Sequence, residues 1–259
     1  MIELLKQLDY CPPNLKEYSS GGLEILAEKF LPDYGKKRTA NDLYYNYRLL
    51  VNGHEWTSYN TKTHSQAYEL YSHHYFAKGH CICTGLGLGV RESWILKKKE
   101  VTKVTVLEKN EEVIEYHKIN NPDLYNNIEI INMDALEYEG KCDTLLLDHY
   151  EQESMNYILN NASQILKNID CNVMWIWTLE DFITLYQRHL NRENRFSLSK
   201  IDIYNQFKED LKLDKLPEVT EDLLHLFYFM FNSKEVSDYE VLSEYDKNNP
   251  RLLIGGTQR

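Results

Sequence analysis

The chain has few of the features that mark secreted, membrane or metal-binding proteins. Its five cysteines are scattered and odd in number, which does not suit a disulfide framework. Cys81 and Cys83 stand two positions apart with no second pair of ligands at a zinc spacing, so we expect no metal site. No apolar run approaches the ~20 residues of a membrane-spanning helix, and acids stand where a signal peptide would begin with basic residues. These absences predict a reduced, cytoplasmic protein that spans no membrane.

Positive charge is also scarce. The sequence has 29 Lys and Arg against 40 Asp and Glu, which gives a formal net charge of −11. Proteins that bind duplex nucleic acid present a basic surface to the phosphates, and here no basic run is longer than three residues. The charge balance therefore argues against a nucleic-acid partner. A homodimer is compatible with this composition.

What the sequence does contain is a strand, a glycine-rich turn, a helix and a second strand within residues 80–108. The β-rich run His80–Thr84 ends in the sequence GLGLG, whose glycines are Gly85, Gly87 and Gly89. Glycine suits a sharp turn where the backbone must approach a ligand closely. Glu108 stands about twenty residues further on, where a nucleotide-binding βαβ unit places a carboxylate for the ribose hydroxyls. The pattern predicts a nucleotide-type site, and the alternative is a glycine turn that only packs the helix on the strand.

Strands and helices are expected to alternate around this unit. We expect strands at 80–84, 103–108, 128–132, 143–148 and 171–177, with helices at 90–98, 110–119 and 152–168 between them. Such a series predicts an α/β fold with a doubly wound, mostly parallel, Rossmann-like sheet.

The flanking segments follow other patterns. Residues 1–40 look helical and irregular, 43–51 and 54–59 form a hairpin across Asn52-Gly53, and 63–77 fits a helix. Residues 179–235 are helix-rich, and 239–255 fits an antiparallel hairpin. We therefore expect two units, an N-terminal segment with its hairpin at 1–78 and a Rossmann-like domain at 79–259 that contains a helical insertion at 179–235.

Acidic side chains follow the third and fourth expected strands. Asp134 can accept a hydrogen bond from an adenine amino group while Ala135 offers a backbone N–H, and the alternative is that Asp134 caps the next segment. Asp148, His149, Tyr150 and Glu151 come directly after the fourth strand, where Asp and Glu suit a general base or an ammonium clamp. Because open α/β sheets bind ligands at the carboxyl ends of their strands, these side chains are expected to meet the glycine turn.

These same segments resemble the class I S-adenosylmethionine-dependent methyltransferases, and more closely their spermidine-synthase-like branch. The similar runs are TGLGLG, VTVLEKNEEVIEYHK, IEIINMDALEYE and KCDTLLLDHYE, and LLVNGHEWTSYNTKTHSQAYEL is similar to the hairpin that covers the active site in that branch. The resemblance spans roughly residues 43–178. It implies a class I methyltransferase type of fold with S-adenosyl-L-methionine bound by the residues Gly85, Gly87, Gly89, Glu108, Asp134 and Ala135.

The chain also departs from its relatives at informative positions. Polyamine synthases carry an Asp within the glycine loop where this chain has Leu88. Many methyltransferases carry an acid at the position of Cys83, so the ammonium of the donor needs another partner here. Nucleobase methyltransferases use an Asn/Asp-Pro-Pro-aromatic loop, and residues 148–151 contain no proline. These departures weigh against aminopropyl transfer and against nucleobase methylation.

The sequence thus predicts a methyltransferase with S-adenosyl-L-methionine as donor and a small-molecule or protein acceptor. Asp148 and Glu151 are the expected catalytic residues, and the expected acceptor-binding residues are Tyr68, Glu69, His149 and Tyr150. Tyr68 and Glu69 belong to the segment expected to cover the site, with helix packing as their alternative role. The alternative functions are a polyamine-type aminopropyltransferase, a nicotinamide-dependent oxidoreductase and a non-catalytic S-adenosylmethionine-binding protein.

Overall fold

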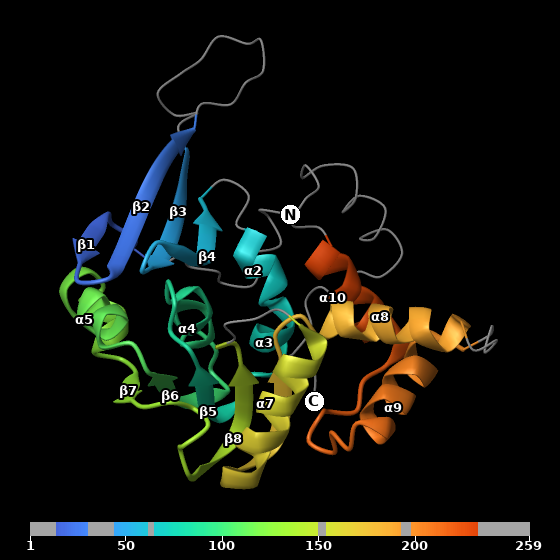
Figure 1. Ribbon diagram of the computed structural model, residues 1–259. Helices are drawn as coiled ribbons and strands as arrows, with labels where there is room; N and C mark the ends of the chain where they lie inside the picture. The colour runs from blue at the N-terminus through green and yellow to red at the C-terminus, as the bar shows by residue number, and fades with distance from the viewer. Residues whose placement is uncertain (1–13, 31–43, 62–64, 150–153, 193–197, 233–259) are drawn as a thin grey trace, which may run out of the picture.

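Two β-sheets organise the computed structural model, which describes residues 14–30, 44–61, 65–149, 154–192 and 198–232 (Figure 1). An antiparallel sheet has the order β1-β2-β3-β4, with the strands β1 Tyr18–Ser20, β2 Leu23–Phe30, β3 Tyr44–Val51 and β4 His54–Asn60. A parallel sheet has the order β7-β6-β5-β8-β9, with the strands β5 Gly79–Thr84, β6 Val101–Glu108, β7 Glu129–Asn132, β8 Gly140–Leu147 and β9 Ile169–Ile176. The described helices are α2 Ser65–Glu69, α3 Tyr71–Phe76, α4 Val90–Ile95, α5 Glu111–Asn120, α6 Pro122–Tyr125, α7 Met155–Asn168, α8 Leu179–Arg192, α9 Lys200–Asp210 and α10 Glu221–Asn232.

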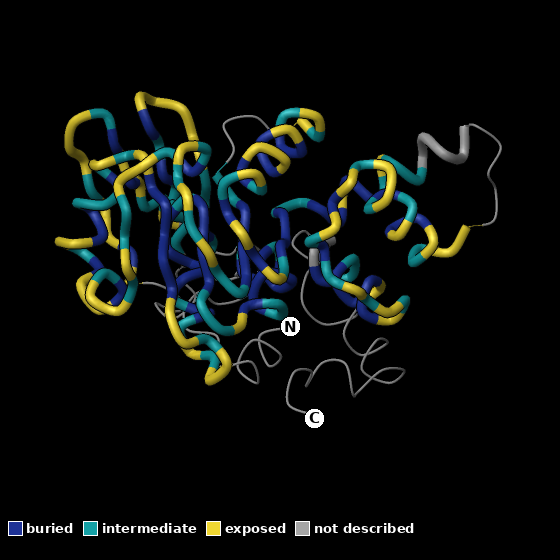
Figure 2. The backbone as a smooth tube through the Cα atoms, turned by 90° about the horizontal axis from the view of Figure 1, so that it is seen from below, coloured by how far each residue is buried: buried dark blue, intermediate teal, exposed yellow. Residues whose placement is uncertain are grey.

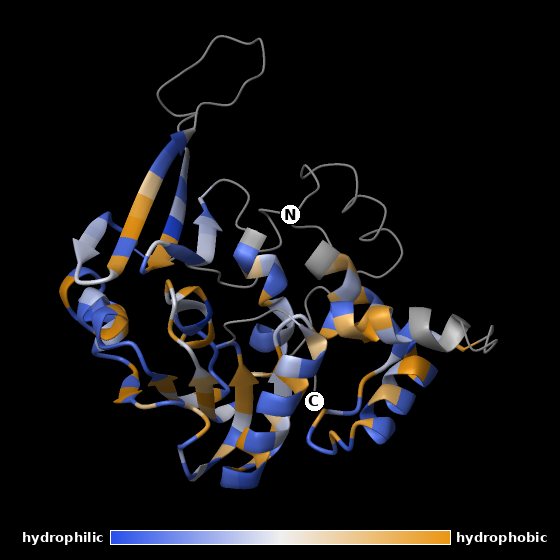
Figure 3. Ribbon diagram, in the orientation of Figure 1, coloured by the Kyte–Doolittle hydropathy of each residue, from blue (hydrophilic) through white to orange (hydrophobic). Residues whose placement is uncertain are grey.

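The parallel sheet confirms the expected Rossmann-like α/β fold. Residues 81–84 of β5 and 144–147 of β8 are buried without a break, because helices cover both faces of the sheet (Figure 2). Figure 3 shows the hydrophobic character of β8. The strand order reverses between β5 and β8, which pair directly through Cys81–Thr84 and Thr144–Leu147. In open α/β sheets such a switch point opens a crevice at the carboxyl ends of the strands.

The N-terminal region differs from its prediction. Residues 14–30 were expected to be helical and irregular, but they contain β1 and β2. Leu23 and Ile25 are buried while Glu24 and Leu26 are exposed, which is the two-residue period of a strand with one covered face. The remaining residues of 1–40, and the C-terminal hairpin expected at 239–255, lie outside the described residues.

The hairpin of β3 and β4 is confirmed, but the single helix expected at 63–77 is wrong. The chain forms α2 and α3 instead, and Leu70 between them has φ −93° and ψ 7°, which interrupts the helical backbone. The expected helix at 90–98 ends earlier, at Ile95.

The helical region after β9 packs on one end of the parallel sheet. The ring of Phe227 on α10 lies 5.5 Å from that of Phe76 and 5.3 Å from that of Trp175, measured between ring centroids. Phe227 of α10 is therefore part of the core. None of the helices in the described ranges is long and apolar enough to cross a membrane.

The antiparallel sheet is held against the parallel-sheet domain by α5. Gly22 N donates to Oε1 of Glu112 at 3.0 Å, and Lys16 N donates to the hydroxyl of Tyr116 at 3.1 Å. Figure 1 shows the antiparallel sheet and α2 on the side to which the parallel strands point. This arrangement places β4 beside the carboxyl ends of the parallel strands.

Candidate functional site

A cavity of about 580 Å³ lies at the carboxyl ends of the parallel strands. Ligand pockets commonly measure about 300 to 1,000 Å³. One wall is the glycine loop, residues 85–89, with Glu108, residues 133–136 and Asp148-His149. Another wall comes from residues 55–58 of β4 and from Gln66 and Glu69 of α2. The segment after β9 contributes Trp177, Thr178 and Asp181. Residues from both sheets therefore line the cavity.

The glycines of the loop are required for two different reasons. Gly85, Gly87 and Gly89 have φ of 72°, 50° and 72°, in the left-handed region that favours glycine. A Cβ on Gly85 would collide with the backbone carbonyl oxygen of Asp148, and one on Gly89 would lie 2.6 Å from Cδ2 of Leu124. A Cβ on Gly87 would meet only Cγ2 of Thr57, at 3.5 Å. Packing therefore excludes side chains at Gly85 and Gly89, whereas Gly87 keeps the loop open toward β4.

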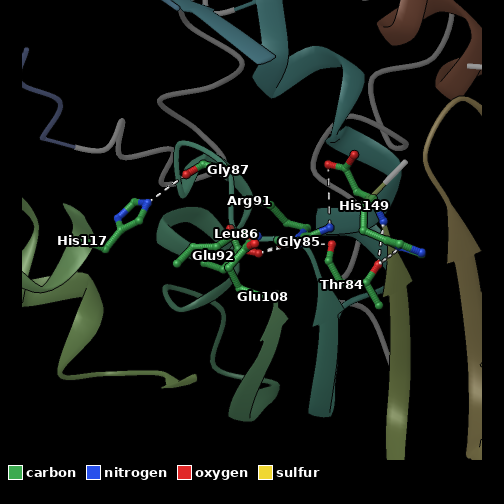
Figure 4. A network of polar contacts seen from close by, with 10 residues as sticks. Thr84, Gly85, Leu86, Gly87, Arg91, Glu92, Glu108, His117 and His149 are labelled. Atoms are coloured by element: carbon green, nitrogen blue, oxygen red, sulfur yellow. Dashed lines mark hydrogen bonds and ion pairs between the residues drawn. The ribbon is translucent and has the colours of Figure 1, made fainter. Parts of the chain in front are cut away.

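Three side chains from three elements hold the backbone of this loop (Figure 4). Nη2 of Arg91 donates to the carbonyls of Thr84 and Gly85 at 3.1 and 2.6 Å. Oε2 of Glu108 accepts from Leu86 N at 2.8 Å, and Nε2 of His117 donates to Gly87 O at 2.9 Å. These contacts restrict the conformation of the loop.

His117 makes this contact as a neutral ring. Its side chain is buried, and this burial lowers the pKa of His117 to about 4, against the opposing effect of the bond to Gly87. A carbonyl oxygen only accepts, so the proton stands on Nε2.

Glu108 occupies the predicted position on the cavity wall. It is 5% exposed, and its Oε1 accepts from Asn110 N at 2.8 Å while Oε2 holds Leu86 N. Burial raises the pKa of Glu108, and these backbone donors oppose that shift. A carboxylate has about four acceptor positions, and the backbone donors do not fill all of them, so the group can still accept from a ribose hydroxyl.

Asp134 and Ala135 also line the cavity, as the sequence predicted. Oδ1 of Asp134 accepts from Leu136 N at 2.9 Å, so the carboxylate also caps the short turn after β7. This capping was the alternative role for Asp134, and the two roles are compatible. Met133 beside them is 37% exposed and offers an apolar surface to the cavity.

Asp148 and His149 form a corner at the end of β8. Asp148 N donates to Oγ1 of Thr84 at 2.9 Å, and Nδ1 of His149 lies 2.7 Å from the same oxygen. The side chain of Asp148 is 31% exposed, with Oδ2 3.8 Å from Nη1 of Arg91. The enclosed position raises the pKa of Asp148, and the Arg91 charge opposes this shift. Tyr150 and Glu151, the other predicted residues of this loop, lie outside the described residues.

The two predicted residues of α2 are placed differently. Glu69 lines the cavity, whereas Tyr68 is 2% exposed and stands in the hydrophobic core, not among the lining residues. The structure thus puts Tyr68 in the packing role that was its alternative. Trp56 on β4, which sequence reasoning missed, lines the cavity with 46% of its surface exposed.

Sequence reasoning also missed Thr84, Arg91, Glu92 and His117. Nε and Nη2 of Arg91 lie 2.8 and 2.6 Å from Oε1 of Glu92, and both side chains are almost fully buried. Burial raises the pKa of Glu92, and Arg91 opposes it. A charged pair in the first turn after a glycine loop, among apolar neighbours, was a signal available in the sequence. Within the described ranges, no group of three or more His, Cys, Asp or Glu residues is arranged to hold a metal ion.

Comparisons with known proteins give partial likenesses. A spermidine synthase from Thermotoga maritima is 14% identical with a TM-score of 0.41, and the match covers 68% of this chain and 62% of that one. A spermidine synthase in complex with the transition state analogue AdoDATO is 15% identical with a TM-score of 0.41 and the same coverage. A Thermoplasma acidophilum protein is 16% identical with a TM-score of 0.34, covering 49% of this chain and 68% of that one.

The chain thus spans less than two thirds of the length of the two spermidine synthases. No protein-family model and no curated protein sequence matches it. The fold assignment rests on the strand order of the parallel sheet.

Proposed function

We propose that this protein is an S-adenosylmethionine-dependent methyltransferase with a small-molecule or protein acceptor. One observation carries the proposal. The glycine loop, Glu108 and Asp134-Ala135 follow three neighbouring strands, β5, β6 and β7, and line one cavity. Their order suits an adenosine whose ribose lies at Glu108 and whose base lies between Met133 and Leu136, with the sulfur end over the glycine loop.

The chemistry requires little covalent participation from the protein. A lone pair of the acceptor attacks the methyl carbon, the C–S bonding pair passes to sulfur, and S-adenosylhomocysteine leaves as a neutral thioether. A nitrogen or oxygen acceptor also loses a proton, for which Glu151 remains the predicted base and Asp148 the predicted residue beside the reacting group. The main contribution of the protein is to hold donor and acceptor in line.

The charges of the cavity support a cationic acceptor. Seven carboxylates and two cations line it, namely Glu55, Glu69, Glu92, Glu108, Asp134, Asp148 and Asp181 against Arg91 and Lys109. Trp56 and Trp177 add aromatic faces, which attract ammonium groups. The same acidic lining favours the second candidate, aminopropyl transfer from a decarboxylated donor to an amine. Leu88, in place of the Asp of polyamine synthases, favours methyl transfer instead.

A ligand-stabilisation experiment separates these functions. S-adenosylhomocysteine at ~10 times its Kd is expected to stabilise the folded protein by about 1.4 kcal/mol, because it binds only the native state. S-adenosyl-3-thiopropylamine, its decarboxylated analogue, and NAD are measured at the same concentrations by thermal unfolding. Stronger stabilisation by the decarboxylated analogue favours aminopropyl transfer. Stabilisation by NAD alone, or by none of the three, contradicts the proposal.

Glu69 provides a test of the acceptor side. With labelled S-adenosylmethionine and a panel of mono- and diamines, Glu69→Gln is expected to lower kcat/KM for the methylated amine about tenfold, the scale of one lost charged contact. The Kd of S-adenosylhomocysteine should stay unchanged. Glu55→Gln is the matched control, because Glu55 is a second carboxylate that lines the same cavity, on β4, where it forms an ion pair with Arg48, Oε2 to Nε at 2.7 Å. Equal losses in both variants would argue against a specific role for Glu69.

A further inference from the structure

Thr84, the last residue of β5, links the glycine loop to the Asp148-His149 corner. Its side chain is 0% exposed, and its hydroxyl meets both Asp148 N and Nδ1 of His149, at 2.9 and 2.7 Å. The backbone carbonyl of the same residue accepts from Arg91 at 3.1 Å. A buried hydroxyl with two partners on another strand end fixes their position, since each lost bond would leave a buried polar group unsatisfied.

Arg91 approaches the same corner from α4. Its Nη2 and Nε are engaged by the carbonyls of Thr84 and Gly85 and by Glu92. Its Nη1 is buried and has no hydrogen-bond partner; the nearest acid is Asp148, whose Oδ2 lies 3.8 Å away. This distance is too long for a hydrogen bond but short enough for electrostatic attraction. Arg91 thus anchors the backbone around Thr84 and, from α4, attracts the Asp148 carboxylate.

The charges of this cluster indicate what it can receive. Arg91 is the single cation between the carboxylates of Glu92 and Asp148, so the three groups together carry one net negative charge, and Asp148 is the partly exposed member. The corner stands beside Gly85 at the end of β8, and β5 separates it from Glu108 at the end of β6. Cys83, where methyltransferases carry an acid, is fully buried and offers the donor no charge. An ammonium group at the far end of the donor therefore finds its carboxylate in Asp148.

We propose that Thr84 and Arg91 are positioning residues, which hold the Asp148-His149 corner so that Asp148 receives the ammonium group of the donor's amino-acid chain. This inference rests on the proposed function. It assigns the two residues to the tail of the donor alone, because among the described residues neither side chain forms a hydrogen bond or ion pair with Glu108, Asp134 or Ala135. Variants at these positions should therefore distinguish ligands that differ only in the tail.

The experiment compares two ligands by calorimetry, S-adenosylhomocysteine and 5′-methylthioadenosine, which is the same adenosine thioether without the amino-acid chain. Thr84→Val keeps the shape of the side chain but removes its hydroxyl. We expect it to weaken binding of S-adenosylhomocysteine about tenfold, the scale of one lost hydrogen bond that holds the corner, and to change the Kd of 5′-methylthioadenosine less than about twofold. Thr84→Ser should restore wild-type binding. Arg91→Lys, which loses the forked geometry, should resemble Thr84→Val.

A double-mutant cycle completes the test. If Thr84 acts through Asp148, adding Thr84→Val to Asp148→Asn should cause little further loss of S-adenosylhomocysteine affinity. Equal weakening of both ligands in Thr84→Val and Arg91→Lys would show a general structural role and overturn the inference while the proposed function stands. Binding of 5′-methylthioadenosine also reports that each variant is folded. Failure of the wild-type protein to bind either ligand would overturn the proposed function, and this inference with it.

Discussion

Gly85→Ala is expected to destabilise the protein by about 3 kcal/mol or more. Two effects add at this position. A left-handed backbone costs a residue with a Cβ roughly 1 to 2 kcal/mol, and φ at Gly85 is 72°. The new Cβ would also collide with the carbonyl oxygen of Asp148, and such overpacking typically costs about 1 to 3 kcal/mol more. The measurement is the free energy of unfolding from denaturant titration.

Gly87 provides the matched control in the same loop. Its φ is 50°, but a Cβ there has only Cγ2 of Thr57 nearby, at 3.5 Å. Gly87→Ala should therefore cost only the backbone strain, roughly 1 to 2 kcal/mol. Gly87→Val should leave a folded protein but abolish binding of S-adenosylhomocysteine, because its methyl groups extend into the cavity. Comparable destabilisation by Gly85→Ala and Gly87→Ala would contradict the different packing of the two positions.

Glu108→Ala is expected to weaken the binding of S-adenosylhomocysteine by about 2 to 3 kcal/mol, which corresponds to roughly a 30- to 150-fold increase in Kd. The variant removes the acceptor for the ribose hydroxyls and also the anchor of Leu86 N. Because 5′-methylthioadenosine carries the same ribose, its binding should be weakened to the same extent. This outcome differs from that expected for Thr84→Val, so the two variants separate the ribose end from the tail.

Glu129→Ala is the control for loss of a carboxylate that lies outside the cavity. Glu129 lies on the neighbouring strand β7, is paired with Lys103 at 2.8 Å between Oε2 and Nζ, and is not among the residues lining the cavity. Its removal should leave both ligands bound with wild-type Kd. Unchanged affinity in a folded Glu108→Ala protein would remove Glu108 from the site.

The parallel sheet could be read from the sequence because each strand carries its own local signal. Continuous apolar runs such as 145–147 are typical of a strand that is covered on both faces, and the glycine turn and the acids follow directly after strands. Glu108, Asp134 and Asp148 were therefore placed on one cavity before the tertiary structure was known. The strands within residues 14–30 were wrongly predicted as helical and irregular, because an alternating pattern shorter than ten residues competes with the turn signals around it.

The sequence by itself determined the fold class, the glycine loop and the carboxylates at the strand ends, since these follow from the local order of residues along the chain. Only the tertiary structure decided that Thr84 holds the Asp148-His149 corner and that His117, thirty positions away, holds the carbonyl of Gly87. It also decided that Tyr68 belongs to the core while Glu69 faces the cavity. The physical reason is that a buried hydrogen bond joins groups from separate elements. Its partners are therefore set by how those elements pack, which no local pattern encodes.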